Sequence, residues 1–164
     1  MGNLIPLREL GFPVDTRPPA TSMQMAQSAT GGTRNKMEKT RFAKIWEEAL
    51  GAGLEAGAKH TPTPMIVVQH ADPFRDKSSI VKQYPPVMGG VCGFAWVSVK
   101  PGTSSFARWL KAAGLARADS YYGGVTYWVS LYNQSMERKE AHAQAMAEVL
   151  RKYGIKAYAQ SRMD

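Results

Sequence analysis

The fold prediction starts from the stretch GVCGFAWVSVKPGTSSFARWLKAAG, residues 90–114, because two kinds of regular structure follow each other within it. The apolar run over 91–99 is typical of a buried strand. Thr103 or Ser104 can then cap a helix whose apolar residues recur at helical spacing, and Gly114 supplies a stop signal. This stretch therefore predicts a strand followed by a short helix.

The remaining residues predict a hairpin, a second helix and a last strand. The glycine pair at 123–124 separates a short strand at 121–122 from a strand over 125–132. Ser135 precedes a long helix, and residues 155–160 alternate in polarity as a strand does. Strand, helix, hairpin, helix, strand is the order of a ferredoxin-like α+β sandwich, in which two helices cover one face of an antiparallel sheet.

The chain ahead of this domain divides into three segments of different composition. Residues 1–32 contain four prolines and are predicted to form an extended arm. Residues 33–60 are predicted to form a helix, because apolar side chains recur there every three to four residues. Residues 61–89 contain five prolines and are predicted to be a connector and loop, apart from a short strand over 65–68. The α+β domain covers residues 90–164.

The arm begins with apolar side chains, which a chain that only stays solvated would not need. We predict that these side chains bind a partner protein. They are Leu4, Ile5, Leu7, Leu10 and Phe12.

Glycines interrupt the second half of the predicted helix over 33–60. Each costs about 1 kcal/mol of helix stability relative to alanine. We expect Gly53 to allow another backbone to approach closely, and Gly57 to mark a fraying helix end.

Charge is distributed unevenly along the chain, which has a net charge of +8. Residues 90–164 carry ten basic and five acidic side chains, whereas residues 46–89 carry four and five. A basic surplus favours nucleic acid or an acidic protein surface as a partner. A solvated basic surface without such a partner is the alternative. No run of 18 apolar residues occurs, so no membrane partner is expected.

No group of residues predicts a catalytic, cofactor or metal site. Cys92 is the single cysteine, lies in an apolar strand, and has no histidine at a spacing typical of cysteine enzymes, so we interpret it as a core residue. His70, Asp72 and Asp76 fall short of the three or four convergent ligands of a metal site. The glycine pairs lack the spacing and the lysine of a phosphate-binding loop. We therefore predict a protein that is not an enzyme.

The stretch CGFAWVSV, residues 92–99, resembles the RNP1 strand of RNA-recognition motifs. The resemblance implies that Phe94 and Trp96 stack on bases, and Trp128 on a similar strand could extend the platform. Two positions depart from the pattern, since Cys92 replaces a basic residue and Val99 replaces an aromatic one. The alternative is that these rings pack under an arm, a loop or a neighbouring subunit.

Four segments, the first of which overlaps this strand, resemble small proteins encoded by tailed bacteriophages. They are GVCGFAWV at 90–97, FARW at 106–109, NQSM at 133–136 and IKAYAQSRMD at 155–164. The resemblance extends over residues from about 61 to 164. It implies a viral origin and carries over no functional residue.

Three functions follow from these observations as expectations. The first is a non-enzymatic virion component, a capsid decoration, cement or minor head protein that binds the major shell protein or its own copies. Such a protein would be found in the virion and, before assembly, in the host cytoplasm. The second is a module that binds single-stranded nucleic acid through Phe94, Trp96 and Trp128. The third is an intracellular host-takeover protein that binds one host protein.

Overall fold

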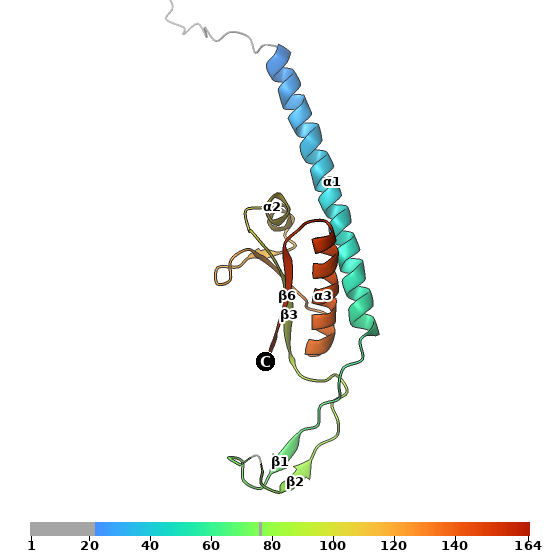
Figure 1. Cartoon of the computed structure of the whole chain (residues 1–164), viewed down its shortest axis with the longest axis vertical. Helices are drawn as coiled ribbons and strands as arrows, with labels where there is room; N and C mark the ends of the chain where they lie inside the picture. Colours follow the sequence, from blue (N-terminus) through green and yellow to red (C-terminus); the bar gives the residue numbers. More distant parts are fainter. Residues whose placement is uncertain (1–21, 76) are drawn as a thin grey trace, which may run out of the picture. The chain divides into compact units, whose positions relative to one another are not determined.

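The structure is a computed structural model that describes residues 22–75 and 77–164, with side chains described from Gly32 onward. It is a mixed α+β protein, and its described part contains three helices and two antiparallel sheets (Figure 1). The chain divides into two compact units, residues 1–37 and 38–164. The core and the candidate site belong to the second unit.

The order of elements after residue 90 confirms the predicted strand, helix, hairpin, helix and strand. The four-stranded sheet has the order β4-β5-β3-β6 with antiparallel neighbours throughout, and β1 pairs with β2 in a separate antiparallel sheet. In chain order the elements are α1 (Ser22–Lys59), β1 (Val68–His70), β2 (Ile80–Gln83), β3 (Gly93–Val99), α2 (Ser105–Ala112), β4 (Arg117–Ala118), β5 (Val125–Trp128), α3 (Met136–Lys152) and β6 (Ala157–Met163).

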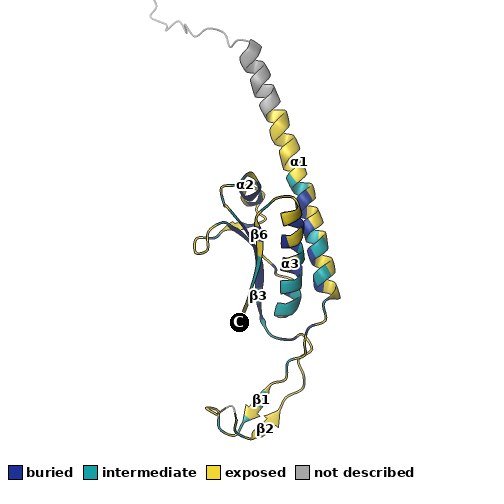
Figure 2. Ribbon diagram, viewed as in Figure 1, coloured by how far each residue is buried: buried dark blue, intermediate teal, exposed yellow. Residues whose placement is uncertain are grey.

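The hydrophobic core lies on one face of the four-stranded sheet. Ala95, Val97 and Val99 alternate along β3, so they point to the same face, and all three belong to the core cluster. Buried residues of the second unit's part of α1, of α2 and of α3 belong to the same cluster, so the three helices cover this face. Figure 2 shows the buried residues along β3 and where α1 and α3 run side by side. The opposite face of the sheet carries no helix of the described chain.

The helix α1 begins earlier than the sequence indicated. It starts at Ser22, so the prediction of an extended arm is wrong for residues 22–32. The segment MQMAQ, residues 23–27, consists of good helix formers and follows the last proline of the arm, which explains the longer helix. The predicted partner-binding residues lie outside the described part of the chain. They are Leu4, Ile5, Leu7, Leu10 and Phe12.

The segment predicted as connector and loop, residues 61–89, contains the β1–β2 hairpin. The strand expected at 65–68 is displaced, because β1 occupies Val68–His70 and Met65 forms only an isolated bridge with Val87. The β-branched pair Ile80 and Val81 starts β2. The prolines and charges around this short apolar pair concealed the strand from the sequence analysis.

Gly53 and Gly57 of α1 behave alike, although we expected different roles for them. A Cβ added to Gly53 would lie 2.7 Å from the ring of His142 in α3, so Gly53 is packed, although against side chains instead of another backbone. Gly57 is also buried, and an added Cβ would lie 2.5 Å from the ring of Tyr132. The expectation of a fraying end at Gly57 is therefore wrong, since the last turns of α1 are packed.

The hairpin of the domain is also shifted relative to the prediction. Residues 121–122 form a turn instead of a strand, and the strand before the turn is β4, Arg117–Ala118. The carboxylate of Asp119 explains the turn, because its Oδ1 accepts hydrogen bonds of 2.9 Å from the backbone N–H groups of both Tyr121 and Tyr122. Gly123 and Gly124 then adopt φ values of 70° and 93°, which glycine tolerates best.

Candidate functional site

The face of the four-stranded sheet opposite the core gathers aromatic side chains. Phe94 and Trp96 alternate with the core residues of β3 and therefore point away from the helices. In the register of the sheet Trp96 pairs with Trp128 of β5, and Phe94 pairs with Arg162 of β6. Directly paired residues on antiparallel strands share a face. The structure thus brings together the three aromatic residues that the sequence singled out.

The three rings form one contiguous group, which we call the aromatic face. The ring centroids of Trp96 and Trp128 are 4.7 Å apart with an interplanar angle of 34°, and those of Phe94 and Trp128 are 6.2 Å apart at 83°. Trp128 is 50% exposed, whereas Trp96 is only 8% exposed. Trp128 therefore offers its ring surface to a ligand, and Trp96 supports it from the side of β3.

A hydrogen-bonded glutamine holds Trp96 in place. Gln160 of β6 accepts at its Oε1 from the indole Nε1–H of Trp96 at 2.8 Å and from the hydroxyl of Ser98 at 3.0 Å. Both donors are buried, so these hydrogen bonds fix the indole more firmly than exposed ones would. No local sequence pattern indicates the role of Gln160, because it depends on the pairing of β3 with β6.

A hollow of about 450 Å³ opens beside the aromatic face. Its volume lies in the range of small-molecule sites. The turn after β4 forms one wall, with Tyr121 and Tyr122 in edge-to-face contact at a centroid distance of 4.6 Å. The residues that line it are Trp96, Asp119, Tyr121, Tyr122, Trp128 and Arg162.

The charged groups around this face are mostly cationic. The guanidinium carbon of Arg162 lies 5.8 Å from the ring centroid of Phe94. Lys139 of α3 is buried, and its Nζ, 5.6 Å from the same centroid, donates to the backbone carbonyl of Gly93. Lys100 donates through Nζ to the backbone carbonyl of Tyr122 at 2.8 Å. Asp119 is the one acid that lines the hollow. The backbone N–H of Tyr122 is the main reason why the pKa of Asp119 is lowered, so this carboxyl group is ionised at neutral pH.

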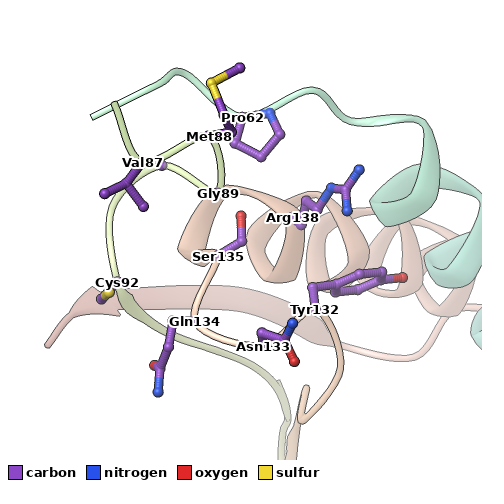
Figure 3. A pocket seen from close by; sticks show the side chains of 11 residues that line it. Pro62, Val87, Met88, Gly89, Cys92, Tyr132, Asn133, Gln134, Ser135 and Arg138 are labelled. Carbon is purple, nitrogen blue, oxygen red and sulfur yellow. The ribbon is translucent and has the colours of Figure 1, made fainter. Parts of the chain in front are cut away.

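A second hollow, also of about 450 Å³, lies where α3 begins (Figure 3). The hydroxyl of Ser135 points into it and has no hydrogen-bond partner. Arg138 donates through Nε to the carbonyl of His60 at 3.1 Å. Glu137 accepts from the backbone N–H of Thr63, so a carboxylate already occupies the positive N-terminal end of α3.

The residues considered for a nucleophilic or a metal site are Cys92, His70 and Asp72. The lining of the second hollow includes Cys92 but no imidazole or carboxylate that could activate the thiol. His70 bonds through Nδ1 to the carbonyl of Ser78, and Asp72 accepts from the backbone N–H of Phe74, so both stabilise their loop. No group of three or more potential metal ligands occurs among the residues that the structure describes.

Within the described part of the chain, no helix is both long and apolar enough to span a membrane. Comparisons with models of protein families, with curated proteins and with solved structures found no match to this chain.

Proposed function

We propose that residues 90–164 form a ferredoxin-like sandwich whose helix-free face binds single-stranded nucleic acid. The order of elements from β3 to β6 is β-α-β-β-α-β, which is the order of that fold. The two long strands β3 and β6 and the hairpin strands β4 and β5 form a single antiparallel sheet. This arrangement leaves one sheet face free for a ligand.

The observation that carries the proposal is the aromatic face on the two inner strands, β3 and β5. RNA-recognition motifs bind single strands by stacking bases on aromatic side chains of a four-stranded sheet. Here Trp128 offers a half-exposed ring, and Phe94 and Trp96 support it. Stacking on such rings tolerates any base, because every base has a flat apolar surface.

The electrostatics of the domain support the same proposal. Residues 90–164 carry a net charge of +5, and Arg162 lies beside Phe94. Position 92 lacks the basic residue of the RNP1 pattern, so Arg162 would contact the phosphates in its place. Such contacts make affinity fall steeply with salt concentration.

The test is a binding titration of a labelled single-stranded oligonucleotide of about a dozen bases, followed by fluorescence anisotropy at low salt. Trp128→Ala should weaken binding by about 5-fold or more, since stacking contributes roughly 1–3 kcal/mol per base. Trp96 is left intact because it is buried. Phe74→Ala is the matched control, since Phe74 is 94% exposed and lies outside the aromatic face. No binding by the unmodified protein at low salt would exclude this function.

A second proposal, a virion protein that binds the shell protein or its own copies, is favoured by the β1–β2 hairpin. All four residues of β2 are exposed, and Ile80 and Val81 are 55% and 60% exposed. A two-stranded hairpin is marginally stable alone in water, so a partner that covers these side chains would stabilise it.

Co-sedimentation with purified phage particles tests this second proposal. Replacing Ile80 and Val81 together by serine should abolish co-sedimentation, whereas Trp128→Ala should leave it unchanged. If the serine variant co-sediments as well as the unmodified protein, the hairpin is not the docking element.

A further inference from the structure

The carboxylate of Asp119 is held in a fixed orientation at the wall of the hollow beside the aromatic face. Its Oδ1 accepts two backbone N–H groups, from Tyr121 and Tyr122, and its Oδ2 accepts the hydroxyl of Thr126 at 3.1 Å. Each carboxylate oxygen can accept two hydrogen bonds. Oδ1 is therefore saturated, and Oδ2 keeps one acceptor position.

The remaining acceptor position distinguishes between bases. An ionised carboxylate only accepts hydrogen bonds, and cytosine offers it the exocyclic amino group N4, a known partner of aspartate. Thymine carries the acceptor O4 at the same place on its ring. A thymine in the hollow would therefore place its carbonyl oxygen O4 against the carboxylate of Asp119, where neither group can donate a hydrogen bond. A cytosine would instead donate a hydrogen bond from its amino group to the carboxylate.

We propose that the hollow is a base-selective site in which Asp119 favours bases with an exocyclic amino group, cytosine in particular, over thymine and uracil. This inference rests on the proposed binding of single strands. The base would stack on Trp128, and Arg162, which also lines the hollow, would contact the neighbouring phosphate. A cationic ligand is disfavoured at these aromatic rings, because the positive charges of Arg162 and the nearby Lys100 would repel it.

The experiment compares oligo-dC with oligo-dT of equal length, two pyrimidines of similar ring size, in the anisotropy titration at low salt. Oligo-dC should bind about 10-fold more tightly, the effect of one hydrogen bond to a charged group. Asp119→Asn keeps an oxygen for the turn and adds an amide N–H₂, which can donate to O4 of thymine. This variant should lose or reverse the preference for oligo-dC.

Asp164→Asn is the matched control, because it removes one exposed negative charge outside the hollow and should leave the preference unchanged. Equal binding of the two oligonucleotides by the unmodified protein would overturn the base selection and leave the proposed function intact. An unchanged preference in Asp119→Asn would also overturn it. Binding of neither oligonucleotide would overturn both proposals.

Discussion

At the scale of the residue, two polar side chains prepare the candidate site for a ligand. Gln160 fixes the indole of Trp96, and Asp119 fixes the turn that carries Tyr121 and Tyr122. Both act before any ligand arrives, so a base that enters meets rings already in position. Such preorganisation raises affinity because less conformational entropy is lost on binding.

The sequence indicated the aromatic residues of the site but not these polar ones. Phe94 and Trp96 lie in one recognisable strand, and Trp128 lies in a second strand of similar sequence. Gln160 is 64 residues away from the indole that it holds, and only the register of β3 with β6 brings them together. Non-local pairing of this kind leaves no local pattern in a single sequence.

The buried imidazole of His142 makes stability depend on pH. His142 in α3 is fully buried, its Nδ1 lies 3.0 Å from the hydroxyl of Tyr132, and its Nε2 has no partner. Burial lowers the pKa of His142 below its usual 6.5. At pH values between the lowered pKa and 6.5, the unfolded chain binds a proton at His142 that the folded chain does not bind. The free energy of unfolding therefore falls as the pH drops below 6.5.

Urea unfolding at pH 7.5 and pH 5.5 measures this effect. The unmodified protein should be less stable at the lower pH. His142→Gln has no titratable group at this position and should show a smaller difference between the two pH values, even if it is less stable at both. An equal difference in the variant would contradict the assignment to His142.

At the scale of the element, the long helix α1 packs against the rest of the domain at Gly53 and Gly57. Gly53 and Gly57 let the helix approach His142 and Tyr132 closely. The apolar stripe of this helix was predictable from its spacing, but its start at Ser22 was not, because propensity alone sets helix ends poorly. The hairpin of β1 and β2 was missed for a related reason, since its strands are three and four residues long.

A pair of glycine substitutions in α1 tests this packing. Gly51→Ala should raise the free energy of unfolding by about 0.5–1 kcal/mol, because its Cβ would meet open space and alanine favours the helix. Gly53→Ala should lower it by about 1–3 kcal/mol, because its Cβ would lie 2.7 Å from the His142 ring and 2.8 Å from the Cγ of Met146. Urea unfolding of the two variants gives both values. Changes of the same sign would show that α1 does not pack on α3 as described.

At the scale of the whole molecule, the aromatic face and the predicted partner-binding arm belong to different units. The aromatic face belongs to the unit 38–164, whereas the apolar cluster from Leu4 to Phe12 belongs to residues 1–37. The core cluster and the side chains packed against it extend from Phe42 to Ala159, so they also lie within the second unit. A truncation at the N-terminus can therefore separate nucleic-acid binding from any docking through the arm.

Deletion of residues 1–32 should leave the melting temperature nearly unchanged, because no described core residue is removed. The truncated protein should bind oligo-dC as tightly as the full chain, since the aromatic face and its hollow lie between Phe94 and Arg162. If the cluster of Leu4, Ile5, Leu7, Leu10 and Phe12 binds the shell, co-sedimentation with particles should be lost. A thermal melt, an anisotropy titration and a co-sedimentation assay measure the three properties. Unfolding or aggregation of the truncated protein would show that residues 1–32 belong to the core, and the prediction of a partner-binding arm would then be wrong.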